Sequence, residues 1–162
     1  MRRFRIAPAR RPADIAAAAA LFRAYAAGLE VDLAYQGFAE ELAGLPGLYA
    51  PPAGELLLAF SGTAEPLGCV ALRPLEGERV CEMKRLYVAP EARGLGVGRA
   101  LAAAIIGAAR DLGYAEMRLD SLLSMAPAIA LYRKLGFAEI PAYYRSPIAG
   151  TRYFSLVLSP PG

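Results

Sequence analysis

The sequence predicts a mixed α/β fold in one domain over residues 1–162, with three α/β/α layers around a central, mostly antiparallel mixed sheet. Three observations lead to this prediction. The chain has 162 residues, of which 56% are hydrophobic and 20% charged, enough for one domain with a real core. Apolar residues recur at helical spacing in some segments and as short strand-like runs in others. The expected order, β-α-α-β-β-β-α-β-α-β-β, combines a meander with a strand–helix–strand crossover, which places helices on both faces of a sheet.

The first third of the chain is expected to form one strand and two helices. Residues 4–7 give a short strand, after which Pro12 and Asp14 suit the first turn of a helix. The apolar face of this helix consists of Ile15, Ala18, Phe22, Tyr25 and Leu29. Gly28 is a plausible stop signal, and residues 37–45 form a second, weaker helix before Pro46.

The remaining two thirds contain most of the predicted sheet. The expected strands are residues 55–60, 67–75, 79–88, 116–120, 137–141 and 152–158. One helix follows a glycine-rich segment after Val88 and ends before Gly113, and another runs from Ser124 to Leu135.

A turn at residues 76–78 is expected to join two antiparallel strands and to set their register. It should place Cys69 opposite Arg85 and Cys81 opposite Arg73. A disulfide between the two cysteines is therefore not expected.

Composition excludes several classes of chemistry. The chain has no histidine, which removes Ser-His-Asp and Cys-His nucleophile systems and histidine metal sites. Two cysteines without CxxC spacing cannot build a zinc site, so we expect no metal and a cytoplasmic protein with reduced thiols. A net charge of +3 without a basic and aromatic stripe predicts no nucleic-acid partner. The sequence also lacks an apolar run long enough to cross a membrane.

Charge is unevenly distributed along the chain. Residues 24–72 contain no Lys or Arg but six acidic residues, namely Glu30, Asp32, Glu40, Glu41, Glu55 and Glu65. The segments on either side have a basic excess. This asymmetry indicates either a cationic substrate on one side and an anionic ligand on the other, or an unevenly composed solvated surface.

The segment from Arg93 to Arg99 has the features of an anion site. Gly94, Gly96 and Gly98 precede or open a helix whose first N–H groups have no internal acceptor, and an arginine lies at each end. A diphosphate suits this arrangement best, with a plain flexible turn as the alternative. A P-loop would need Lys-Ser/Thr after Gly98, and the antiparallel strands before the segment fit a nicotinamide dinucleotide poorly.

Two motifs in this order resemble those of the GNAT superfamily of acyl-CoA N-acyltransferases. The first is R-G-L-G-V-G at Arg93–Gly98, after the strand K-R-L-Y-V at Lys84–Val88. The second is A-L-Y-R-K-L-G-F at Ala130–Phe137, similar to the helix end of that family. The order of elements agrees over nearly the whole chain, so the resemblance implies the GNAT fold and acetyl transfer from acetyl-CoA to an amine.

The resemblance also implies which residues hold acetyl-CoA. The strand end Leu86–Val88 would bind its pantetheine arm, and the glycine-rich segment would bind its diphosphate. The implied residues are Leu86, Tyr87, Val88, Arg93, Gly94, Leu95, Gly96, Val97, Gly98 and Arg99.

Two catalytic residues are carried over from the family. Tyr132 is the expected donor of a proton to the leaving thiolate, with a packing role as the alternative. Glu82 is the expected base; the alternatives are an ion pair with Lys84, or an ordered water acting as base. A backbone N–H near Leu86 would stabilise the oxyanion. Many members have Asn seven residues before the tyrosine, where this chain has Met125.

The acceptor is the least specified part of the prediction. The family lines this site with the first two helices, which places Glu30, Asp32 and Glu40 near an amine that their charge predicts to be cationic. For Tyr143, Tyr144 and Tyr153 the alternatives are an aromatic wall of the acceptor site, core packing, or the surface of a homodimer. Two other functions stay open: an acyl-CoA sensor without turnover, and a nicotinamide dinucleotide-binding protein.

Overall fold

The computed structural model describes residues 3–29, 31–77, 79–122 and 125–158. Its strands are β1 (Phe4–Pro8), β2 (Glu55–Ser61), β3 (Pro66–Pro74), β4 (Val80–Val88), β5 (Glu116–Ser121), β6 (Ala138–Ile140) and β7 (Arg152–Val157). Its α-helices are α1 (Pro12–Ala27), α2 (Phe38–Ala43), α3 (Val97–Asp111) and α4 (Ala126–Lys134). Three 3-10 helices join them, η1 (Leu33–Gln36), η2 (Gly47–Tyr49) and η3 (Pro90–Ala92). The predicted order of strands and α-helices is confirmed.

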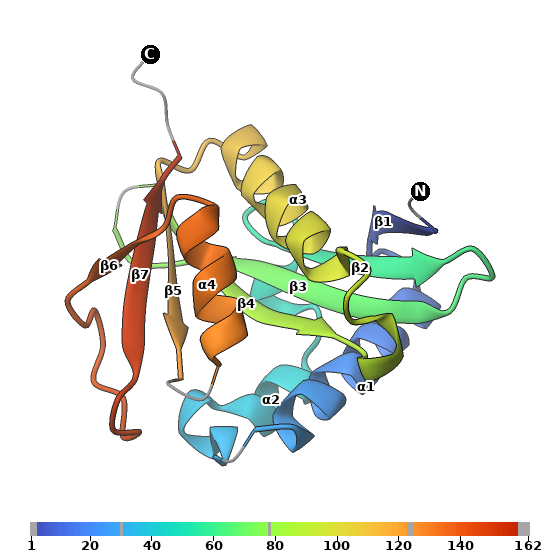
Figure 1. Cartoon of the computed structure of the whole chain (residues 1–162), viewed down its shortest axis with the longest axis horizontal. Helices are drawn as coiled ribbons and strands as arrows, with labels where there is room; N and C mark the ends of the chain where they lie inside the picture. The colour runs from blue at the N-terminus through green and yellow to red at the C-terminus, as the bar shows by residue number, and fades with distance from the viewer. Residues whose placement is uncertain (1–2, 30, 78, 123–124, 159–162) are drawn as a thin grey trace.

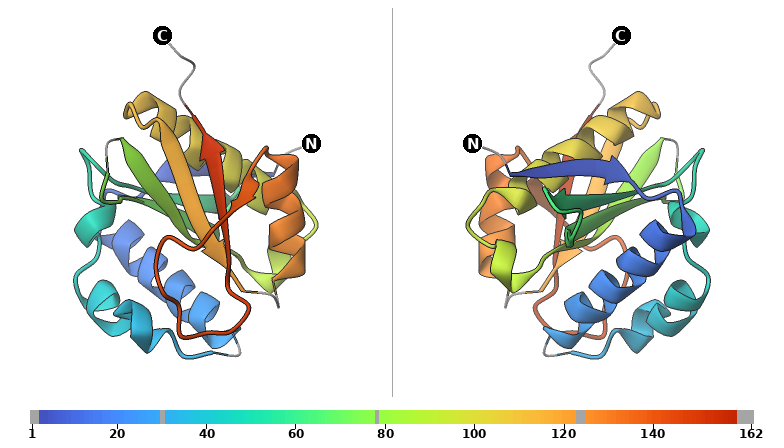
Figure 2. Two further views of the ribbon diagram at one scale, coloured as in Figure 1. Left: turned by 90° about the vertical axis from the view of Figure 1, so that its left-hand side faces the viewer. Right: turned by 90° about the vertical axis from the view of Figure 1, so that its right-hand side faces the viewer.

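One mixed sheet forms the middle layer of the molecule. Its seven strands lie in the order β1-β2-β3-β4-β5-β7-β6, and every neighbouring pair is antiparallel except β4 and β5. Helices α1 and α2 lie on one face, and α3 and α4 lie on the other (Figures 1 and 2). The predicted three-layer architecture is therefore confirmed. None of the helices in the described part of the chain is long and apolar enough to cross a membrane.

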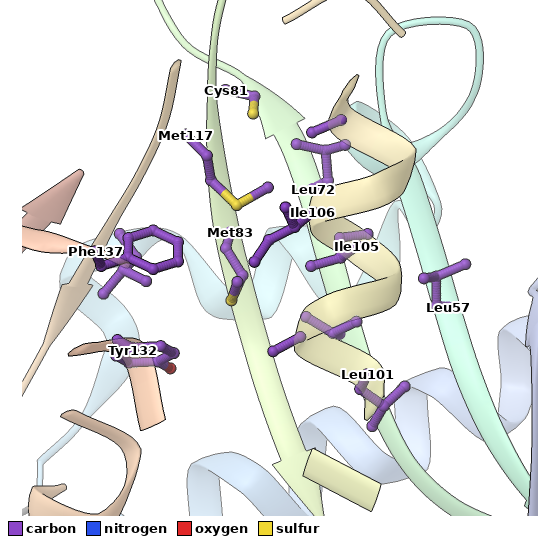
Figure 3. Close-up of a cluster of buried hydrophobic side chains, with 14 of the residues drawn as sticks. Leu57, Leu72, Cys81, Met83, Leu101, Ile105, Ile106, Met117, Tyr132 and Phe137 are labelled. Atoms are coloured by element: carbon purple, nitrogen blue, oxygen red, sulfur yellow. The ribbon is translucent and has the colours of Figure 1, made fainter. Parts of the chain in front are cut away.

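Each face of the sheet has its own hydrophobic core. Leu101, Ile105 and Ile106 of α3 pack on one face, with Leu72 of β3 and Met83 of β4 in the same cluster (Figure 3). On the other face, the cluster contains Phe22 of α1 together with Tyr49, Leu56 and Leu58. Alternate residues of β2 thus enter opposite cores, which explains why its apolar run is continuous rather than alternating. Burial on both faces fixes the register of the sheet.

The sheet opens between β4 and β5. These strands pair only through Val80–Glu82 and Glu116–Arg118, although β4 continues to Val88 and β5 to Ser121. Among the described residues no ladder contact joins the two strands beyond that point. Because β5 stays paired with β7 along its length, the divergence leaves β4 with a free edge that faces the interior.

A bulge in β4 corrects the predicted strand register. Cys69 lies opposite Tyr87 rather than Arg85, and Cys81 lies opposite Pro74 rather than Arg73. The register shifts between Cys69 and Ala71, opposite Arg85, whose φ is +61°. Both cysteines are free, as expected, and the Cys69 thiol donates to the Arg85 carbonyl at 3.3 Å.

Candidate active site

The largest pocket of the site lies where β4 diverges from β5, between the end of α1 and α4. It has a volume of about 550 Å³. It is lined by Leu86, Tyr87 and Val88 of β4, by Arg93 and Gly98, and by residues of the α1 and α4 ends. Five of the ten residues predicted to hold acetyl-CoA therefore share this pocket. The other five (Gly94, Leu95, Gly96, Val97 and Arg99) belong to the loop and first turn beside it.

The loop before α3 has the backbone that an anion site needs. Gly94 and Gly96 have φ angles of +82° and +83°, and a Cβ at either position would meet nothing within 4 Å. The positive φ angles explain why both residues are glycine, and the absence of side chains leaves open space in front of the loop. Gly96 precedes α3 without a side-chain cap, so the first N–H groups of the helix point outward as donors.

The side chains of this loop divide between solvent and core. Arg93 and Arg99 are exposed, and Arg93 Nε also donates to the Val88 carbonyl at 3.1 Å, which ties the loop to the end of β4. Leu95 is exposed, whereas Val97 is buried in the core below α3. Two exposed cations therefore flank an array of backbone donors.

Tyr132 lies at the second, smaller pocket between the strands. This pocket shares Tyr25, Leu86 and Met125 with the large one, and its lining adds Lys84 and Asp120. Tyr132 is only 6% exposed, and its ring contacts those of Phe137 and Phe154. Burial raises the pKa of the Tyr132 phenol above its usual value, so the hydroxyl keeps its proton at neutral pH.

Glu82 lies on β4 but is enclosed by its own partners. Its side chain is 2% exposed and accepts from Arg73 Nη2 at 2.8 Å and from the Tyr143 hydroxyl. The alternative partner, Lys84, bonds elsewhere: its Nζ donates to Gln36 Oε1 at 3.1 Å. Both Glu82 and Lys84 are buried, yet only Lys84 lines the pocket that contains Tyr132.

Asp120, at the end of β5, is the carboxylate that lines the Tyr132 pocket. It accepts a hydrogen bond from the Tyr144 hydroxyl, and its other oxygen lies 3.9 Å from Lys84 Nζ. Burial lowers the pKa of the Lys84 ammonium, an effect that Asp120 partly offsets.

The acidic residues of the first third do not gather at the pocket. Asp32 caps η1 by accepting from the Ala34 N–H at 2.9 Å, and Glu30 lies outside the described residues. Glu40 is exposed and lines a separate hollow of about 300 Å³ between α2, η2 and β3. Glu41 forms two 2.9 Å bonds to the Arg85 guanidinium, so its charge is internally paired.

Sequence reasoning did not assign three charged residues that the fold brings to this site, and it left the role of two tyrosines open. Lys84, Arg85 and Asp120 lie on the diverging strands, and Tyr143 and Tyr144 reach this region from the β6–β7 connection. Figure 2 shows this connection as a long loop extending past the strand ends. The signal that could have identified the strand residues is their charge within otherwise apolar strands.

Comparisons with known proteins agree with this geometry. A family model described as acetyltransferase (GNAT) family matches residues 20–137. An uncharacterised N-acetyltransferase of Schizosaccharomyces pombe is 40% identical over 148 residues, which covers 91% of each chain.

Solved structures show the same fold. A Klebsiella pneumoniae protein assigned to the acyl-CoA N-acyltransferases superposes with a TM-score of 0.75 at 27% identity, covering 96% of this chain and 98% of its own. A Salmonella typhimurium protein assigned as an acetyltransferase, solved with its cofactor acetyl-CoA, gives a TM-score of 0.68 at 22% identity, covering 98% of this chain and 95% of its own. At that identity, the second likeness concerns the fold.

Proposed function

The chain belongs to the acetyltransferase (GNAT) family and is an acyltransferase, and we propose that it moves an acetyl group from acetyl-CoA to an amine of a small molecule or peptide by direct transfer. One observation carries the proposal. The pocket beside the glycine-rich loop and the pocket containing Tyr132 share Leu86, so a ligand held by the loop extends to the opening between β4 and β5.

The residues present fit acetyl-CoA as the acyl donor. A diphosphate would meet the N–H groups at the start of α3 and the charges of Arg93 and Arg99. The edge of β4 at Leu86–Val88 offers backbone groups to an extended amide-containing arm. The Salmonella protein of the same fold has acetyl-CoA as its cofactor, which supports this assignment.

The chemistry that we assign to this chain uses two of its groups at the opening. The bulge takes Arg85 and Leu86 out of the regular ladder with β3, and we assign to the Leu86 N–H a hydrogen bond to the thioester oxygen. Tyr132 holds the proton that the departing thiolate requires. The amine nitrogen forms the new bond to the acetyl carbon as the carbon–sulfur bond breaks.

The amine must also lose a proton, and for that role we keep Glu82. Its carboxylate is bonded to the Tyr143 hydroxyl, so a proton would reach it through that hydroxyl or an ordered water. The proposal specifies the acceptor only as an amine. A cationic amine bound through Glu30, Asp32 and Glu40 stays a prediction, and both described residues of this set, Asp32 and Glu40, are exposed.

Ligand binding and turnover of the wild type and of Tyr132→Phe test the proposal together. Thermal unfolding is measured with acetyl-CoA, CoA and NAD, and thiol release is measured with an amine panel. A ligand at 100 times its Kd stabilises by about 2.7 kcal/mol. Each kcal/mol raises Tm by roughly 2–4 °C in a domain of this size. We expect a shift with both CoA species and none with NAD.

The tyrosine variant separates an enzyme from a sensor. Tyr132→Phe should keep the acetyl-CoA shift while kcat falls about a hundredfold, because a general acid contributes about 10²–10⁴. Tyr114→Phe is the matched control, since that hydroxyl bonds the Ala53 carbonyl far from the pocket. Binding without turnover in the wild type would favour a sensing module, and no shift with CoA would remove the donor assignment.

A further inference from the structure

We propose that the acceptor is a zwitterion with adjacent amine and carboxylate groups, as in an α-amino acid, and that Asp120 binds its ammonium while Lys84 binds its carboxylate. This inference rests on the proposed acetyl transfer and names its substrate class. It replaces the prediction of a cationic amine bound by acidic residues with recognition by two opposite charges, Asp120 and Lys84, in the pocket that contains Tyr132.

Asp120 and Lys84 form a loose pair whose charged atoms are not in direct hydrogen-bond contact with each other. Their closest atoms are 3.9 Å apart, whereas the pairs Arg73–Glu82 and Arg85–Glu41 close to 2.8 and 2.9 Å. The side chains of Lys84 and Asp120 are only 6% and 12% exposed. A buried charge without a close partner is costly, so a ligand that satisfies each of these charges gains binding free energy.

Each of these two groups has unused hydrogen-bonding capacity. The Lys84 ammonium has three N–H donors, and one of them is directed to Gln36 Oε1. The Tyr144 hydroxyl binds one Asp120 oxygen, which leaves the oxygen nearer Lys84 able to accept from an ammonium. A purely cationic amine satisfies only Asp120, whereas a ligand with both an ammonium and a carboxylate satisfies both groups.

The other charges around the pocket are already neutralised within the protein. Arg85 lines the same pocket, but its guanidinium is bonded to Glu41 and to Gln36 Oε1. Glu82 is bonded to Arg73 and Tyr143. Among the charged residues that line this pocket, Lys84 and Asp120 are therefore the pair left to recognise an acceptor.

Their position suits the transfer reaction. Both residues line the pocket that contains Tyr132 and Leu86, so an amine at Asp120 lies beside the groups assigned to the thioester. An adjoining pocket of about 20 Å³ shares Asp120 and has both apolar and polar residues in its lining, among them Leu29, Leu33, Tyr35 and Ser121. We assign this pocket to the side chain of the acceptor, and its small volume predicts an amino acid with a small side chain.

The test compares matched compounds in the thiol-release assay with acetyl-CoA. The panel contains the L-amino acids with small and with aromatic side chains, the carboxamide and the decarboxylated amine of each, and spermidine as a cation without a carboxylate. We expect kcat/KM for the best amino acid to exceed that for its carboxamide by at least tenfold. Spermidine should be a poor acceptor.

The variant Lys84→Met tests the residue. It should lower kcat/KM for the amino acid at least tenfold and change that for the carboxamide less than twofold. Lys134→Met, at an exposed position at the end of α4, should change neither. A normal thermal shift with acetyl-CoA shows that each variant is folded; if Lys84→Met fails this check, the acid–amide comparison in the wild type decides.

Three outcomes would overturn this inference and leave the acetyl transfer standing. They are equal use of acid and carboxamide, equal loss of both in Lys84→Met, and preferred use of spermidine. If no amino acid is acetylated and none raises Tm in the presence of CoA, the inference also fails. Failure of acetyl-CoA itself to raise Tm would instead contradict the proposed function.

Discussion

Two carboxylates on the diverging strands are held by neighbouring tyrosines of one loop. Tyr143 donates to Glu82 on β4, and Tyr144 donates to Asp120 on β5. The rings of these tyrosines also contact each other and Tyr153, at centroid distances of 5.3–5.7 Å. The β6–β7 loop therefore fixes both carboxylates across the opening, although only Asp120 lines the Tyr132 pocket.

This difference in placement predicts different kinetic effects when each carboxylate is replaced by the amide of the same shape. Asp120→Asn should raise the acceptor KM by about tenfold or more, because it removes the charge that binds an ammonium. Glu82→Gln should leave that KM unchanged and lower kcat by about a hundredfold, as expected for loss of a base. Steady-state kinetics with saturating acetyl-CoA measure both parameters. An unchanged kcat in Glu82→Gln would show that Glu82 serves only to hold Arg73 and Tyr143.

The residues of the site differ in how far sequence could identify them. Tyr132 and the Arg93–Arg99 loop lie within local motifs, so a short stretch of sequence is enough to find them. Tyr143 and Tyr144 act on strands 61 and 24 residues away, and no local pattern specifies that contact. For Glu41 the sequence leaves open a cationic-substrate site or a solvated surface, whereas the residue is paired with Arg85, 44 residues further along the chain.

At the scale of elements, α3 begins at a glycine whose conformation and surroundings can be tested separately. Gly96 has a φ of +83° next to the proposed diphosphate site, and Gly113 has a φ of +89° after the other end of the helix. Neither would clash with an added methyl group. An alanine would adopt the same unfavourable φ at both positions. The two positions differ only in that Gly96 lies next to the proposed acetyl-CoA site.

Gly96→Ala and Gly113→Ala should therefore lose similar stability but differ in acetyl-CoA binding. An alanine in the left-handed region costs about 1–2 kcal/mol. Only Gly96→Ala should also raise the acetyl-CoA KM, by at least about tenfold, since its methyl group keeps the diphosphate away from the helix N-terminus. Thermal unfolding and acetyl-CoA titrations separate these effects. The same KM in both variants would mean that the Gly96 backbone does not contact the diphosphate.

The elements themselves were largely predictable, because helices buried on one face show a 3.6-residue apolar period and strands buried on both faces show short continuous apolar runs. The bulge in β4 was not predictable. Residues with positive φ are usually glycine, but the bulge places Arg85 at +61°, so its sequence reads as an uninterrupted strand. Gly68 on β3 was the available signal: a Cβ there would lie 2.6 Å from the Tyr87 carbonyl oxygen. A lone glycine in a strand indicates such a close approach without giving the register.

At the scale of the whole molecule, helices α3 and α2, on opposite faces, are attached to the sheet by different forces. Helix α3 places six buried residues in the core on its face of the sheet, including Leu101 and Ile105. Helix α2 has six residues, none of them buried, and Glu41 on this helix is bonded to Arg85. Phe38 and Tyr25 add their rings around the Arg85 guanidinium at 5.1 and 5.7 Å. The buried Arg85 guanidinium thus joins α2, in the layer formed by α1 and α2, to the bulge of β4.

Loss of the Glu41 charge should accordingly destabilise the whole fold. The Arg85 side chain is 2% exposed, and breaking a buried ion pair by removing one partner costs about 3 kcal/mol or more. Glu41→Gln should therefore lower Tm by roughly 6–12 °C. Glu40→Gln, at an exposed position of the same helix, should change stability by less than about 0.5 kcal/mol.

The double variant Arg85→Met with Glu41→Leu tests the origin of that loss. It removes both charges, so no uncompensated cation is left, and most of the Tm lost in Glu41→Gln should return. If the fold depends on the charges themselves, the double variant will be no more stable than the single one. If Glu41→Gln is as stable as Glu40→Gln, the ion pair does not hold α2 to the sheet. In that case α2 must be held by its apolar contacts to the core that contains Phe22.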